Sequence, residues 1–187
     1  MTDLYQDLLD SINVPARFFT SGDAFLRAWS ADWQGGLILD LRMPGIGGIE
    51  VLRRLREMDS HLPVIVVTGF GEIRSTVQAM KLGAIEFLEK PFTHTELIDA
   101  VQAMLEKSRE HHTEQALCQE KEACLASLTT RELEVAKLIA RGMTSPEIAA
   151  LLSISWRTVD LHRAHIREKM KCSSSVELAA LFSRDLR

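Results

Sequence analysis

A short apolar run that ends in an acidic residue constrains the fold of this chain more than any other feature. Residues 37–39 (Leu-Ile-Leu) follow two glycines and precede Asp40, so they predict a strand that is buried on both faces. A helical pattern begins at Gly48, after the turn sequence Met-Pro-Gly. In an open parallel sheet, ligands and reactive groups gather at the C-terminal ends of the strands. Asp40 is therefore a candidate reactive carboxylate; the alternative is that it begins a turn or caps a helix.

Two later apolar runs favour a reactive role for Asp40. Residues 63–67 are followed by Thr68, and residues 84–88 are followed within two positions by Lys90. The three predicted strand ends thus offer a carboxylate, a hydroxyl and an ammonium group. This set suits the attack of an aspartate on a phosphoryl group, with Asp40 as the nucleophile. Lys90 would pair with the phosphoryl oxygens as a point charge, and the Thr68 hydroxyl would donate to the same oxygens.

Strand and helix patterns alternate along the first half of the chain. Residues 16–19 form a further candidate strand, and Thr93 with Glu96 forms a capping box that opens a final helix. This alternation predicts an α/β fold with a doubly wound parallel sheet. Other helices are expected at residues 2–11, at residues 23–29, around residues 49–55 and at residues 73–82.

Length and composition exclude several classes of protein. The chain has 187 residues and is 46% hydrophobic, which suits one large domain or two small ones with packed cores. It contains no apolar run long enough for a membrane span, and its polar, acidic N-terminus is unlike a signal peptide. Cys118, Cys124 and Cys172 form neither a zinc pattern nor an even disulfide set. A reducing cytoplasm is the expected location.

Charge is distributed unevenly and predicts three segments. Residues 1–105 carry 9 Lys and Arg against 14 Asp and Glu, and residues 106–126 carry 3 against 5. Residues 127–187 carry 10 against 7. An acidic first module and a basic last module favour nucleic acid as the partner of the last module. The segment 106–126 contains no Gly or Pro, so we expect a helical linker rather than a flexible tether.

The last module is predicted to contain four helices. Residues 129–132 (Thr-Thr-Arg-Glu) and residues 144–147 (Thr-Ser-Pro-Glu) are capping boxes, and Gly142 follows the first of these helices. Ser155 is a good N-cap for the longer basic helix that follows. A short helix, a tight turn and a longer basic helix make a helix-turn-helix over residues 144–163. The second helix would lie in the major groove of DNA.

The first module resembles the response-regulator receiver domain. The matching segments are LILDLRMPG around Asp40, VVTG after the second strand, and AIEFLEKPF. The resemblance implies a flavodoxin-like fold, phosphorylation of Asp40, a switch role for Thr68 and a phosphate-pairing role for Lys90. It also places Phe87 where the family has a rotating aromatic side chain, for which the alternative is a plain core residue. The Lys90–Pro91 bond is typically cis in the family.

One departure from this family concerns its metal site. Receivers begin with a strand that ends in an acidic pair, and this pair holds the Mg²⁺ needed for phosphoryl transfer. That strand is absent here, and Asp3 and Asp7 lie beyond the place of the pair. The remaining expected ligands are Asp40 and the backbone carbonyl of Arg42. Because unpaired backbone groups cost about 1–3 kcal/mol each, we expect a start codon placed too late; the alternative is a regulator that works without phosphorylation.

The segment LTTRELEVAKLIARGMTSPEIAALLSISWRTVDLHRAHIREKM resembles the LuxR-type DNA-binding domain, as found in regulators of the LuxR/FixJ group. The resemblance and the helical positions together place one set of side chains on the floor of the groove and another beside phosphates. Arg163 could reach either a base edge or a phosphate, and the alternative for Arg163 and Lys169 is a solvated face. The expected groove residues are Asp160, Leu161 and Ala164, and the expected phosphate contacts are Arg157, Thr158, Lys169 and Lys171.

Together the two resemblances imply a two-component response regulator with a receiver at residues 1–105 and a DNA-binding domain at residues 127–187. We expect a sensor histidine kinase to phosphorylate Asp40, and the phosphorylated form to dimerise and bind promoter DNA beside RNA polymerase. One alternative is a phosphorylation-independent regulator whose receiver is a dimerisation scaffold. A phosphatase is disfavoured, because Arg42 stands where a second carboxylate would serve as the general acid. We therefore expect no enzymatic activity.

Overall fold

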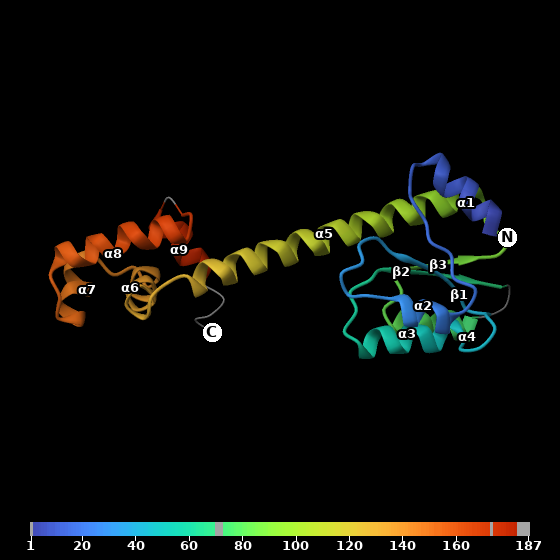
Figure 1. The fold of residues 1–187 in the computed structure, drawn as a ribbon, viewed down its shortest axis with the longest axis horizontal. Helices are drawn as coiled ribbons and strands as arrows, with labels where there is room; N and C mark the ends of the chain where they lie inside the picture. The colour runs from blue at the N-terminus through green and yellow to red at the C-terminus, as the bar shows by residue number, and fades with distance from the viewer. Residues whose placement is uncertain (1, 70–72, 173, 183–187) are drawn as a thin grey trace. The chain divides into compact units, whose positions relative to one another are not determined.

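The computed structural model describes residues 2–69, 73–172 and 174–182. It divides into two compact units, Met1–Thr113 and Glu114–Arg187, which are coloured from blue to yellow-green and from yellow to red in Figure 1. A single helix, α5 (His94–Ala126), contributes residues to both units. Each unit has its own hydrophobic core, and each is described separately below.

A parallel sheet of three strands forms the centre of the N-terminal unit. The strand order is β1 (Leu37–Asp40), β2 (Val64–Thr68) and β3 (Glu86–Glu89). Every residue of β2 is buried, because this central strand is covered on both faces. Helices α1 (Thr2–Ser11) and α5 pack on one face of the sheet (Figure 1). Helices α2 (Gly22–Ala28), α3 (Gly48–Glu57) and α4 (Ile73–Lys81) pack on the other face.

The predicted doubly wound parallel sheet is therefore confirmed, but the strand predicted at residues 16–19 is wrong. These residues have no regular secondary structure. Residues 15–20 make no backbone hydrogen bond within the described part of the chain. Strand propensity is insufficient here because a strand needs a partner backbone. Phe19 instead packs against the rings of Phe25 and Trp33, with centroids 5.5 and 6.1 Å away.

Helix α5 begins at the capping box that the sequence predicts. The Thr93 N–H donates to Glu96 Oε2 at 2.7 Å, and the Glu96 N–H donates to Thr93 Oγ1 at 3.3 Å. Leu97, Val101 and Met104 are buried against the sheet. Residues 106–126 all lie within the helix, as expected for a segment without Gly or Pro.

The C-terminal unit contains the four predicted helices. They are α6 (Thr130–Ala140), α7 (Ser145–Leu152), α8 (Trp156–Lys169) and α9 (Ser175–Phe182). Apolar residues from all four form one core, which includes Val135, Ile148, Val159, Ile166 and Leu178. The turn between α7 and α8 is tight because Ser153 adopts a left-handed conformation, with φ 52°. No helix in the described ranges is both long and apolar enough to cross a bilayer.

Candidate functional site

Asp40 and Lys90 meet at the C-terminal edge of the sheet. The Lys90 ammonium donates to Asp40 Oδ2 at 2.6 Å, and the backbone N–H of Arg42 donates to Asp40 Oδ1 at 2.9 Å. The Asp40 side chain is 35% exposed and the Lys90 side chain is 28% exposed, so solvent can reach the carboxylate. Asp40 ends β1 and Lys90 follows β3. The parallel sheet thus brings together two residues that are 50 positions apart in the sequence.

Thr68 lies at the same edge, at the end of the central strand. Asp40 pairs in register with Val67, so Thr68 is the next residue of β2 toward the edge. Its side chain is buried, and its hydroxyl donates to the Gly69 carbonyl at 3.4 Å. Phe87, on the neighbouring β3, is 43% exposed, which contradicts the alternative that it is a plain core residue.

The structure adds Tyr5 to this edge, a residue that the sequence analysis did not single out. Burial first, and the negative charge of Asp40 second, raise the pKa of the Tyr5 hydroxyl. Its ring lies 6.1 Å from that of Phe92, which follows the cis Lys90–Pro91 bond. No sequence pattern indicated this position, because the approach of α1 to the strand ends depends on tertiary packing.

The described residues do not fit a complete Mg²⁺ site. Receiver domains typically bind Mg²⁺ for phosphorylation, through several oxygen ligands. In the ranges that the structure describes, no three His, Cys, Asp or Glu side chains lie close enough together to hold a metal ion. The Asp40 carboxylate already accepts hydrogen bonds from Lys90 and Arg42. Asp7 is exposed on α1, and the side chain of Asp3 lies outside the described residues.

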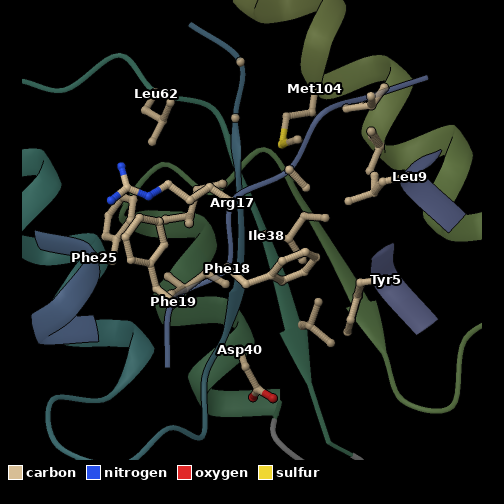
Figure 2. Close-up of a pocket in the computed structure, with 18 of the residues that line it drawn as sticks. Tyr5, Leu9, Arg17, Phe18, Phe19, Phe25, Ile38, Asp40, Leu62 and Met104 are labelled. Atoms are coloured by element: carbon tan, nitrogen blue, oxygen red, sulfur yellow. The ribbon is translucent and has the colours of Figure 1, made fainter. Parts of the chain in front are cut away.

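A cavity of about 480 Å³ runs beside β1 from Asp40 toward the opposite end of the strand. Figure 2 shows Asp40 at one end of this cavity and Leu62 and Met104 toward the other. Its walls come from α1, α2 and α5, from β1 and from residues 14–22. We call this cavity the β1 slot.

One face of α8 in the C-terminal unit is exposed and combines apolar and polar side chains. Asp160, Leu161 and Ala164 are exposed, whereas Val159 and Ile166 are buried in the core. Leu161 is 55% exposed, so its apolar side chain is available for contact with a ligand. The Ser145 hydroxyl, at the start of α7, donates to Asp160 Oδ1 at 2.8 Å. This hydrogen bond links the first residue of α7 to the second turn of α8.

The predicted phosphate contacts fall into two groups. Arg157 is exposed at the start of α8, with its guanidinium carbon 5.4 Å from the centre of the Trp156 ring. Thr158 is half-buried, and its N–H donates to the Ser155 side chain that caps the helix. In contrast, Lys169 and Lys171 are each held by a carboxylate of their own unit. The Lys169 ammonium lies 2.7 Å from Glu132, and that of Lys171 lies 2.6 Å from Glu120.

Comparison with known proteins identifies both units. Residues 1–102 match the family described as response regulator receiver domain, and residues 126–182 match bacterial regulatory proteins of the luxR family. The transcriptional regulatory protein FixJ of Azorhizobium caulinodans is 40% identical over 174 residues, which cover 93% of this chain and 82% of that protein. The response regulator protein TodT of Pseudomonas putida is 36% identical over 177 residues, which cover 95% and 78%. The solved structure of the response regulator StyR is 35% identical with a TM-score of 0.90, covering 97% of this chain and 92% of that one.

The chain belongs to the response regulators of two-component systems. The parallel sheet, with Asp40 at its C-terminal edge, has the arrangement of this class. Within this class it is a transcriptional regulator with a LuxR-type DNA-binding domain. The family consists of DNA-binding regulators, which are not enzymes. Promoter DNA and a cognate kinase are the partners that this pairing of domains implies.

Proposed function

We propose that Asp40 accepts a phosphoryl group from a sensor histidine kinase and that phosphorylation promotes dimerisation and promoter binding. The observation that carries this proposal is the 2.6 Å contact between Asp40 and Lys90 beside Thr68. A carboxylate, an ammonium and a hydroxyl at one solvent-accessible edge match the needs of phosphoryl transfer to an aspartate. The family typically uses Mg²⁺, but the described residues supply no complete site for it, so the roles below concern protein groups only.

In the proposed transfer, an oxygen of Asp40 attacks the phosphorus of a phosphorylated histidine on the kinase. The new bond joins this oxygen to phosphorus, the phosphorus–nitrogen bond breaks, and the histidine nitrogen leaves with the electron pair. Lys90 already contacts Asp40 Oδ2, so its positive charge can move to the phosphoryl oxygens as they arrive. Thr68 would then donate its hydroxyl to a phosphoryl oxygen in place of the Gly69 carbonyl.

Movement of Thr68 and Phe87 would connect the phosphorylated edge to a dimer surface. Ile73, Val77 and Met80 occur at helical spacing on α4 and are 75%, 49% and 41% exposed. With Phe87 on β3, they give this side of the receiver an exposed apolar surface of the kind that marks protein–protein contacts. Phosphorylation would favour the conformer in which two copies bury this surface, which is a population shift.

The proposed DNA-binding surface is the exposed face of α8. Asp160, Leu161 and Ala164 would face base edges, and Arg163 would contact a base or a phosphate. Arg157 and Thr158 would contact phosphates. Lys169 and Lys171 would contact phosphates only if bound DNA displaces their carboxylate partners, Glu132 and Glu120.

We also propose the domain limits 1–105, 106–126 and 127–187 for receiver, helical linker and DNA-binding domain. RNA polymerase is the proposed partner at the promoter, and the bacterial cytoplasm is the proposed place of action.

Intact-mass measurement tests the phosphorylation step. The full chain is incubated with acetyl phosphate, with and without Mg²⁺, beside the Asp40→Asn variant. The expected result is a single phosphoryl adduct that Asp40→Asn lacks. The proposal fails if no adduct forms and the folded chain binds promoter DNA with the same affinity in the presence and absence of acetyl phosphate. The regulator would then act without phosphorylation.

The DNA-binding surface is tested with Arg163→Ala and with Lys137→Ala as a matched control, because Lys137 is exposed on α6 outside residues 144–163. Arg163→Ala should weaken promoter binding by about 1–3 kcal/mol and, if Arg163 contacts a phosphate, lower the salt slope by about 1. Fluorescence anisotropy across a salt titration measures both quantities. Equal effects of the two substitutions would show that only general charge matters.

A further inference from the structure

Trp156 is the first residue of α8, and its side chain is 56% exposed. The two other tryptophans of the chain, Trp29 and Trp33, pack against a core of the N-terminal unit. An exposed apolar side chain is by itself common on a protein surface. Two further features, the place of Trp156 in the helix and its contact with Arg157, indicate what the indole can contact.

The place of Trp156 puts its indole at the leading end of α8. Asp160 and Arg163 follow it by four and seven residues, so the three side chains lie on one side of the helix. Asp160 is exposed, so this side borders the face that is proposed to enter the major groove. In a helix-turn-helix, the N-terminal residues of the recognition helix contact the edges of bases.

Arg157 holds the indole in a defined orientation. Its guanidinium carbon lies over the Trp156 ring, 5.4 Å from the ring centre, which is within the range of a cation–π interaction. An indole that is already held in place loses little conformational entropy on binding. The side chain, and not the helix N-terminus, is the binding group here, because the Thr158 N–H already donates to the Ser155 hydroxyl oxygen at 3.1 Å.

DNA displays one kind of apolar group in its major groove. Each base pair presents hydrogen-bond donors and acceptors there, and thymine adds its C5-methyl group. The indole has a single N–H donor and no acceptor, so most of its surface is complementary to this methyl group and not to the polar edges. The positive charges of Arg157 and Arg163 on the same helix suit the neighbouring phosphates.

We propose that Trp156 is a specificity-determining residue that contacts the C5-methyl group of a thymine in the DNA site of this regulator. This role of Trp156 rests on the proposed DNA-binding surface of α8. The indole would select a T·A pair at the position reached by the leading end of the helix. Its contribution to affinity should not depend on salt, because the indole carries no charge and displaces no counterion.

Replacement of thymine by deoxyuridine tests the contact, because it removes only the methyl group. A preferred duplex is first selected from a random DNA library with the full chain in the presence of acetyl phosphate. Each thymine of this duplex is then replaced in turn, and fluorescence anisotropy measures the Kd. One replacement should weaken binding to the natural chain by about fourfold, as expected for the loss of one buried methyl group. The same replacement should leave the Kd of Trp156→Ala unchanged.

Three variants make the result specific. Trp156→Ala should bind the thymine duplex at least about fourfold more weakly than the natural chain does, with an unchanged salt slope. Trp156→Phe keeps an apolar ring and should retain part of the preference for thymine. Leu117→Ala is the matched control, because Leu117 is 62% exposed on α5, outside residues 144–163, and this variant should bind as the natural chain does.

Several results would overturn the proposal. It fails if the selection enriches no sequence, or if no thymine replacement weakens binding to the natural chain. It also fails if the replacement weakens binding to Trp156→Ala equally, or if Trp156→Ala lowers the salt slope, since the indole would then act by positioning Arg157 on a phosphate. Arg163→Ala distinguishes this failure from a failure of the proposed surface. If Arg163→Ala weakens binding but no thymine methyl group matters, only the role of Trp156 is wrong.

A fluorine label gives a result on the natural side chains even if Trp156→Ala fails to fold, as judged by circular dichroism. 5-Fluorotryptophan labels Trp29, Trp33 and Trp156 in the full chain, and Trp156→Phe identifies the Trp156 resonance in the fluorine NMR spectrum. The selected duplex should shift this resonance, and the shift should differ when the critical thymine is replaced by deoxyuridine. An unshifted Trp156 resonance at saturating DNA would contradict the contact.

Discussion

Glu132 is a carboxylate whose side chain is only 5% exposed in the C-terminal unit. Its Oε2 atom accepts hydrogen bonds from the Lys169 ammonium at 2.7 Å and from the Thr129 N–H at 2.8 Å. These two bonds, in that order of effect, lower its pKa from 4.5 to about 2. Removing a charged partner from a buried hydrogen-bonded pair is costly, so Glu132→Gln should lower the free energy of unfolding by about 2 kcal/mol. Chemical denaturation measures this loss.

The same carboxylate gives stability a defined pH dependence. Its pKa is lower in the folded chain than in the unfolded chain, so ionised Glu132 favours the folded state. This contribution is complete above pH 4.5 and is lost as the pH falls toward 2. Glu134→Gln is the control, because Glu134 pairs with Arg131 on the exposed surface of the same helix. If the free energy of unfolding of the two variants falls by the same amount between pH 4.5 and pH 2, Glu132 is not the source of this pH dependence.

The absence of a side chain at Gly36 leaves room for Met104. A Cβ atom at this position would lie 2.3 Å from the sulfur of Met104, whose side chain is 3% exposed. Gly36→Ala should therefore displace the Met104 side chain, and because this thioether is flexible and lines the β1 slot, the free energy of unfolding should fall by at most about 1 kcal/mol. The cost should nearly vanish in the Met104→Ala background, because the displaced atoms are gone. A double-mutant cycle measures the coupling, and additive effects would show that the two residues do not collide.

At the level of elements, the caps explain why the helices begin where they do. The Ser155 hydroxyl oxygen accepts a hydrogen bond from the Thr158 N–H at 3.1 Å, at the first turn of the proposed recognition helix α8. Ser155→Ala should destabilise this turn by about 1 kcal/mol, whereas Ser155→Asn should preserve it. Hydrogen exchange of the Thr158 amide in the full chain is the measurement. Unchanged protection in the alanine variant would mean that tertiary contacts alone hold the turn.

Different interactions stabilise different parts of helix α5. Its first three turns bury Leu97, Val101 and Met104 against the sheet, so packing stabilises them. The following part is mostly exposed, and there the absence of Gly and Pro and the many helix-forming residues maintain the helix. The last turn packs Cys124 and Leu125 against the core of the C-terminal unit.

At the level of the whole molecule, this packing predicts where the C-terminal unit can be cut. A fragment of residues 114–187 keeps Cys124, Leu125 and the ion pair between Glu120 and Lys171. A fragment of residues 127–187 loses all three and should be less stable by about 1–3 kcal/mol, mainly through the lost burial of Leu125. Urea denaturation of the two fragments compares them directly. Equal midpoints would support a domain boundary at residue 127.

The sequence alone determined the features that depend on local pattern. Apolar runs with turn residues at their ends predicted β1, β2 and β3, and capping residues predicted the starts of α5, α6, α7 and α8. Three strand ends were enough to place Asp40, Thr68 and Lys90 at one edge, because parallel strands align their C-terminal ends. The helix-turn-helix could be located for the same reason, since its helix starts and its turn are encoded by residues close in sequence.

Only the tertiary structure decided which groups find partners. Residues 16–19 have the composition of a strand, but no backbone group in the described part of the chain pairs with them, and they are irregular. Lys169 lies on the predicted basic helix, yet its ammonium is bound to Glu132, 37 residues away. Tyr5 reaches the environment of Asp40 only because α1 packs beside the strand ends. Hydrogen-bond partners, burial and cavities depend on which distant segments meet in space, and this information is not present in any local pattern of residues.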